Sequence, residues 1–222
     1  MDPYVTLSMV DYIQLLHAGS VDRSLYEFYT EELAGCTPLQ AAIAIDNLII
    51  RWGNIGDIER TVARFIRAVA RGLDACGKPE FPPESIVFPL SSEHAEISLQ
   101  LEGLRKVFME VLPDLKSGDR AAQASLGREI EMLQSIRVHY LKLQNELFPA
   151  LEAAGAPALC TRLMWYLQDA IWTLQRECMQ FLTAEKWDYA RFSRIYGQLF
   201  FRISSLLYRE DKILFPVACS FI

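Results

Sequence analysis

Residues 139–149 read HYLKLQNELFP, and residues 206–216 read LLYREDKILFP. Each stretch closes a long segment in which apolar residues recur at the period of an amphipathic helix. Both stretches end on Leu-Phe-Pro, and a proline cannot donate the backbone hydrogen bond of a helix interior. We therefore expect two long helices that end alike, at Pro149 and at Pro216.

The same period extends through most of the second half of the chain. It predicts helices over about 91–111, 119–148, 157–183 and 187–215, with short breaks between them. Short connections between long amphipathic helices make consecutive helices antiparallel. Residues 91–222 are therefore predicted to form an up-down four-helix bundle.

Shorter helices are predicted near the N-terminus. One begins at Thr37, a good N-cap, and Pro38 suits its first turn. Gly53 suits the position just beyond its end. A further helix is predicted over residues 21–33, with Leu25, Phe28, Tyr29 and Leu33 on one face.

Prolines concentrate between these two regions, in the stretch CGKPEFPPESIVFPL. Proline removes helical donors and biases the preceding residue toward extended backbone, so this stretch is predicted to be a linker. The chain is thus expected to be all-α. It would comprise a small helical N-terminal domain (1–77), a Pro-rich linker (78–90) and the four-helix bundle (91–222).

The composition is that of a mildly acidic globular protein. Of the 222 residues, 51% are hydrophobic and 23% are charged, and the net charge is −6. The basic residues read as scattered among acids, whereas nucleic-acid binding depends on clustered Lys and Arg. No nucleic-acid partner is therefore expected.

The sequence also predicts a cytoplasmic protein without a membrane partner. Its first residues, MDPYVTLSMVDYIQLL, lack the basic start and apolar core of a signal peptide. No apolar run reaches the roughly 18 residues of a membrane span. The five cysteines are dispersed without a CxxC pair, which is typical of reduced thiols.

Each of the two opening stretches carries half of a metal-binding pair. Residues four apart share a helix face, so a His followed by an acid at that spacing can bind one metal ion. The first stretch has His139 but Leu143 at the acid position. The second has Glu210 at the acid position but Leu206 in place of the His.

Two such helices, each ending on Leu-Phe-Pro, resemble those of the hemerythrin HHE cation-binding domain. The resemblance covers about residues 10–219 and includes EHAEISLQLEGL, GAPALCTRLMWYLQDAIW and the N-terminal segments YIQLLHAGS and WGNIGDIER. It is strongest for a bacterial subfamily in which an N-terminal helical domain of unknown function precedes the bundle. Members often continue into a PAS sensor domain, which is not expected among these residues.

The resemblance implies a di-iron site whose ligands come from all four helices of the bundle. The ligand positions that remain would be His94 on the first helix, His139 on the second and Glu210 on the fourth. Two positions are lost, at Leu143 and Leu206.

The ligand position of the third helix follows the Met164-Trp165 pair. It falls at Gln168, which is also a lost position, with Asp169 beside it as a remaining acid. Gln is a poor iron ligand and Leu supplies no donor atom. No intact di-iron centre, and no cofactor, is therefore expected.

The remaining His and acidic residues allow two interpretations. His94, His139, Glu210 and Asp169 would suit a single iron or zinc ion, because both metals accept imidazole and carboxylate ligands. Alternatively, the two histidines are vestigial, partly buried and hydrogen-bonded to neighbouring side chains.

The sequence favours a binding protein over an enzyme. It has no Gly-rich phosphate loop, no GxSxG and no Cys-His pair. We expect a degenerate hemerythrin-like binding or sensing protein, with a metal-binding or oxygen-sensing protein as the alternative. The partner would be another protein, a second copy of the chain, or a small apolar ligand held by the aromatic residues of 157–215. The second copy would dock on an exposed apolar helix face with Ile43, Leu48, Ile49 and Ile50.

Overall fold

The described part of the chain is entirely helical. The computed structural model describes residues 3–77 and 79–222, and the side chains of all of these except 3–8 and 158–160. Within these ranges no strand occurs, so the predicted all-α class is confirmed. Residue 78 of the predicted linker and the side chain of Cys160 lie outside the description.

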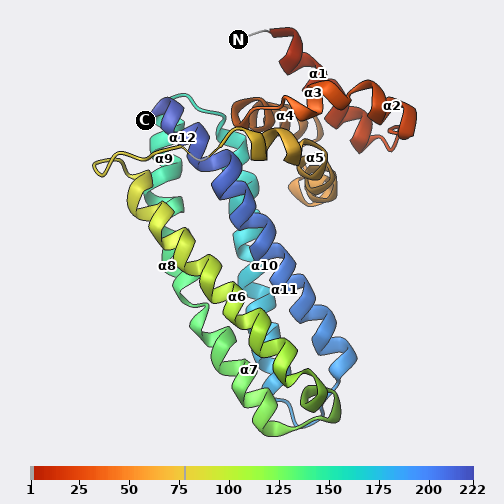
Figure 1. Ribbon diagram of the computed structural model, residues 1–222, viewed down its shortest axis with the longest axis vertical. Helices are drawn as coiled ribbons and strands as arrows, with labels where there is room; N and C mark the ends of the chain where they lie inside the picture. The colour runs from red at the N-terminus through yellow and green to blue at the C-terminus, as the bar shows by residue number, and fades with distance from the viewer. Residues whose placement is uncertain (1–2, 78) are drawn as a thin grey trace.

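The chain begins with a group of helices that pack on one another. They are α1 (Pro3–His17), α2 (Arg23–Phe28), α3 (Thr30–Ala34), α4 (Pro38–Trp52) and α5 (Ile55–Ala75). α1 contacts α3, α4 and α5, and α3 packs against α5. Figure 1 shows this group at one end of the molecule.

The predicted limits of α4 are confirmed, and they depend on local hydrogen bonds. The Oγ1 of Thr37 accepts from the backbone N–H of Gln40, whose side chain accepts from the backbone N–H of Thr37. This reciprocal capping satisfies two of the donors that a helix start leaves unpaired. Gly53 follows the helix with a φ of 70°, a conformation that suits a residue without Cβ.

Two expectations for the N-terminal helices are wrong. The helix predicted over 21–33 is broken at Tyr29, and two residues expected on one face differ, since Leu33 is buried and Phe28 is 73% exposed. The apolar face expected to be free on α4 is also largely covered. Leu48 and Ile49 are buried inside the chain, Ile43 is half-buried, and Ile50 alone of the four is exposed.

The second half of the chain contains longer helices that run side by side (Figure 1). They are α6 (Val87–Ser117), α7 (Arg120–Met132) followed by α8 (Ser135–Lys142), α10 (Ala158–Thr183) and α11 (Tyr189–Arg209). α6 contacts α7, α8 and α11, and α10 contacts α7 and α11. We call Val87–Phe221 the long-helix half.

The two Leu-Phe-Pro sequences do not end their helices, contrary to expectation. The π-helical segment η1 (Leu143–Leu147) leads into α9 (Phe148–Ala153), and η2 (Glu210–Leu214) leads into α12 (Phe215–Phe221). Each proline therefore lies in the first turn of a new α-helix, where a missing N–H is tolerated. A π-helical turn inside an α-helix is rare and often marks a functional position.

Other boundaries also differ from the predicted ones. α6 begins at Val87, inside the predicted linker, because Pro89 falls in the first turn, whose N–H groups have no helical partner. It continues through Pro113 to Ser117. The single helix predicted over 119–148 is interrupted between α7 and α8, at residues 133–134.

The two groups of helices meet at the end where α9 and α12 lie (Figure 1). α4 packs against α10, η2 and α12, and α5 contacts η2 and α10. The guanidinium of Arg202 on α11 pairs with Glu59 on α5 at 2.8 Å. The buried apolar residues of both groups form one cluster. None of the described helices is both long enough and apolar enough to cross a membrane.

Candidate functional site

A buried carboxylate accepts hydrogen bonds from two imidazoles inside the long-helix half. Glu210, the first residue of η2, is fully buried. Its Oε2 is 3.1 Å from Nδ1 of His94 on α6 and 3.2 Å from Nε2 of His139 on α8. The structure thus brings together three residues that the sequence placed on three different helices. We call them the His-Glu-His cluster.

The π-helical turn at Glu210 shapes the backbone beside this cluster. The N–H of Phe215 donates to the carbonyl of Glu210, five residues earlier, and the N–H of Phe148 donates to the carbonyl of Leu143 in the same way. Glu210 and Leu143 occupy equivalent positions before the two prolines. The two helices therefore share a backbone geometry and differ in chemistry, since only one of them presents a carboxylate.

A second carboxylate connects the cluster to the surface. Nδ1 of His139 lies 3.1 Å from Oε2 of Glu93, and the other oxygen of Glu93 pairs with the ammonium of Lys142. The side chain of Lys142 is 40% exposed, whereas that of His139 is 1% exposed. Acid and base thus alternate from the buried Glu210 outward to solvent.

Sequence reasoning missed Glu93 and Lys142. Glu93 immediately precedes His94 in the sequence. Lys142 lies three residues after His139, a spacing that places Lys142 and His139 on one face of their helix. That spacing was the only sequence signal for them. The contact itself joins α6 to α8 and depends on tertiary packing.

The cluster behaves as a buried ion pair. Burial alone would raise the pKa of Glu210, but hydrogen bonds and positive charge from His139 and His94 lower it. Burial alone would lower the pKa of His139, but Glu210 and then Glu93 raise it. Each shift favours the charged form, as expected where a carboxylate and an imidazolium stabilise each other.

The positions of the expected lost ligands lie in the core. Leu143, Gln168 and Leu206 each have no exposed surface. Gln168 accepts a 2.6 Å hydrogen bond from the amide nitrogen of Gln144. Asp169, by contrast, is exposed and takes no part in the His-Glu-His cluster.

Three buried polar atoms near this region have no hydrogen-bond partner among the described residues. They are Oε1 of Glu210, Nε2 of Gln168 and the hydroxyl of Tyr140. Burial, followed by the charge of Glu210, raises the pKa of Tyr140 well above its usual value. Unpaired buried polar atoms are rare and call for a ligand, a water molecule or another explanation.

The residues present do not fit a di-iron centre. Leu143 and Leu206 supply no donor, and Gln168 supplies a weak one. Within the described residues, no three His, Cys, Asp or Glu side chains are arranged to hold a metal ion. The two imidazoles instead bind the same oxygen of Glu210 directly.

Two grooves open on the surface of the long-helix half, and neither is lined by a residue of the His-Glu-His cluster. The larger, of about 1070 Å³, lies between α7–α8 and α10, and its lining includes Arg137, Asp169 and Trp172. The smaller, of about 350 Å³, is lined by residues of α5, η1, α9 and α10, among them Ile55 and Trp165. Neither groove is lined by a described His or Cys.

Comparisons of the chain with models of protein families, with curated proteins and with solved structures find no match.

Proposed function

We propose that this chain is a non-enzymatic binding or sensing protein, built on a hemerythrin-like up-down four-helix bundle without an intact di-iron centre. The observation that carries the proposal is the direct bonding of His94 and His139 to Glu210. A metal centre would need these nitrogen and oxygen atoms as ligands. In the cluster they satisfy one another instead.

The packing around the cluster supports this proposal. Leu143 and Leu206 fill, with apolar side chains, positions that would otherwise carry an acid and a His. A buried polar residue is costly unless it is bonded, so loss of the metal favours leucine at these positions. His94, His139 and Glu210 are retained as a unit that is hydrogen-bonded through Oε2 of the carboxylate.

The surroundings of the histidines support a non-enzymatic role. His94 and His139 are buried, and His17 lies beside Thr61, with its Nδ1 2.9 Å from the hydroxyl. A general base must reach the proton that it removes from a substrate. None of the three lines either of the two grooves described above, so binding at these grooves fits the molecule better than catalysis does.

Thermal unfolding in the presence of metal tests the proposal. A ligand that binds only the folded state must raise the melting temperature. We expect the same melting temperature with and without added Fe²⁺ or Zn²⁺, both for the wild type and for His139→Ala. A rise that occurs in the wild type and disappears in His139→Ala would contradict the proposal.

A single divalent ion is the second candidate, and two observations favour it. Oε1 of Glu210 is buried without a partner, and His139 bonds to Glu93 through the nitrogen opposite the cluster. Metal-binding histidines usually bond to a carboxylate in this way. If this candidate is correct, zinc will bind at one ion per chain by calorimetry, and His94→Ala will abolish the binding.

A further inference from the structure

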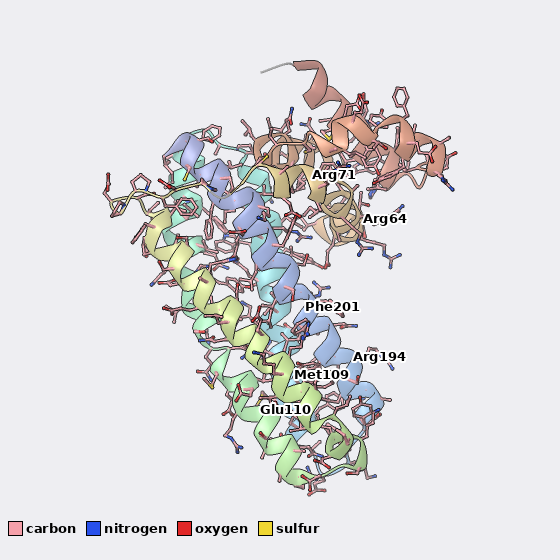
Figure 2. The ribbon with its side chains drawn as sticks, viewed as in Figure 1. Arg64, Arg71, Met109, Glu110, Arg194 and Phe201 are labelled. Atoms are coloured by element: carbon pink, nitrogen blue, oxygen red, sulfur yellow. The ribbon has the colours of Figure 1, made fainter. Side chains whose placement is uncertain are left out.

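Four exposed arginines form a stripe along α5. They recur at intervals of four, three and four residues, which keeps them on one face of the helix. Figure 2 labels two of them, Arg64 and Arg71, beside α5 at the outside of the molecule. The full set, which we call the arginine stripe, is Arg60, Arg64, Arg67 and Arg71.

The stripe makes no hydrogen bond or ion pair within the described part of the chain. By contrast, Arg202 of α11 pairs with Glu59. What distinguishes these cations is their grouping, because one face of α5 gathers four of the chain's 22 basic residues. The expectation that basic residues are scattered throughout is wrong for α5.

α5 holds the stripe rigidly. Its opposite face is buried, with Val62, Phe65 and Val69 having no exposed surface. Near its end, Gly72 lies so close to the turn after α3 that a Cβ there would be 2.8 Å from the backbone nitrogen of Cys36. The arginines therefore project from a fixed backbone, and ordering them on binding costs less than it would on a flexible segment.

We propose that the arginine stripe docks an acidic helix of a partner protein. Its spacing matches that of Asp or Glu side chains on one face of a second helix, which also recur every three or four residues. All four residues are Arg, whose planar fork of donors binds a carboxylate through two parallel hydrogen bonds. This docking is independent of whether the His-Glu-His cluster binds a metal ion.

The surroundings of the stripe favour a protein over a membrane. A helix that lies in a lipid surface buries large apolar side chains in it. On α5 those side chains are in the core, and no large exposed apolar residue belongs to this helix.

The surroundings also favour a protein over a nucleic acid. A nucleic-acid site usually lies on a domain with a strongly basic isoelectric point, since phosphate binding draws on many Lys and Arg. Here exposed acids, Asp57 and Asp74, lie at the two ends of a single helix, on a molecule with a net charge of −6.

A binding titration with two matched variants tests the proposal. The probe is a fluorescent, alanine-rich helical peptide with Glu at the spacing of the stripe, and its anisotropy is measured at low and at physiological salt. Both variants replace four exposed cations by Gln and carry a net charge of −6 − 4 = −10. The stripe variant changes Arg60, Arg64, Arg67 and Arg71, and the control variant changes Arg105, Lys106, Arg128 and Arg194, which are exposed on α6, α7 and α11.

The two variants should differ clearly. If each lost ion pair weakens binding by about twofold, as is typical of exposed pairs, the stripe variant will bind at least roughly tenfold more weakly than the control variant. Binding by the wild type should also weaken with salt, because exposed charges are screened. Equal affinities of the two variants, or no binding by the wild type at low salt, would overturn the proposal.

Further arms distinguish the class of partner. Vesicles containing phosphatidylserine and a duplex DNA are titrated in the same way. The assignment to a protein partner would be overturned if the wild type bound either of them more tightly than the acidic peptide and the stripe variant lost that binding. The double variant Arg64→Glu/Arg67→Glu reverses two charges of the stripe. We expect it to lose binding to the Glu peptide and to gain binding to a peptide with Lys at the same positions. Failure of both changes would contradict docking through the stripe.

Discussion

Replacement of Glu210 by Gln removes one charge from the centre of the molecule and changes little else. The amide has nearly the same shape as the carboxylate, so the packing in η2 should persist. His94 and His139 would then face a neutral acceptor instead of an anion. The variant therefore isolates the electrostatic part of the His-Glu-His cluster.

The expected loss follows from the two hydrogen bonds of 3.1 and 3.2 Å that the carboxylate accepts. A hydrogen bond to a charged group contributes about 1.5–3 kcal/mol and a neutral one about 0.5–1.5 kcal/mol. Two such differences of about 1 kcal/mol give a loss of roughly 2 kcal/mol in the free energy of unfolding. In a chain of this size that lowers the melting temperature by about 4–8 °C.

The loss should depend on pH in a defined way. The pKa of Glu210 is lowered from 4.5, so its contribution is present above pH 4.5 and disappears as the pH falls through the folded-state pKa. The pKa of His139 is raised from 6.5, so its contribution is complete below pH 6.5 and disappears as the pH rises through the folded-state pKa. The ion pair therefore stabilises most between pH 4.5 and 6.5.

Urea unfolding from pH 4 to pH 9 measures this difference, with Asp169→Asn as the control. Asp169 undergoes the same acid-to-amide change but is exposed, so its variant should stay within about 0.5 kcal/mol of the wild type. If Glu210→Gln costs no more than this control, or if its cost does not vary with pH, the cluster is not the buried ion pair described above.

Three further predictions concern packing and thiol reactivity. Gly72→Ala should destabilise by about 1–3 kcal/mol, because the new Cβ would meet backbone atoms of residues 34–36, and an unchanged urea midpoint would refute that contact. Gly103→Ala on α6 should instead stabilise by about 0.5–1 kcal/mol, since its Cβ would meet nothing within 4 Å, and a lowered midpoint would refute this. Burial raises the pKa of Cys36 and Cys178 to about 12, so these thiols should react with a thiol reagent at pH 8 only after unfolding. Cys76 is exposed and should react at once. Rapid modification of Cys36 or Cys178 in the folded protein would contradict this.

Local sequence signals predicted the parts of the fold that depend on local interactions. The limits of α4 follow from Thr37, Gln40 and Gly53, which act within one or two helical turns. The limits of α10 were likewise predicted to within one residue, because a Pro precedes it and a polar break follows it. For such elements the neighbouring residues contain the determining interactions.

The two Leu-Phe-Pro sequences show where this reasoning fails. A proline ends a helix only if the chain cannot rearrange its hydrogen bonds around it. At Pro149 and Pro216 a π-helical turn precedes the proline, so a new α-helix starts with the proline in its first turn. Side-chain burial at Leu143 and Glu210 accompanies that turn, and burial depends on helices distant in sequence.

The candidate site was partly accessible from the sequence. The helical period and the family resemblance predicted His94, His139 and Glu210 as ligand positions. That both imidazoles contact one oxygen of Glu210 depends on the packing of α6, α8 and η2, which the sequence did not show. The position of Asp169 could have been predicted from periodicity alone. Gln168 shares the inward face with Met164 and Ile171, which are buried, and the next residue along a helix points about 100° away.

We propose that the His-Glu-His cluster is held by its own hydrogen bonds instead of by a metal centre. Elemental analysis of the wild type, purified from cells grown with added iron and zinc, distinguishes the two. We expect far less than one iron or zinc ion per chain, and the same content in His139→Ala. One or two ions per chain in the wild type, lost in His139→Ala, would contradict it.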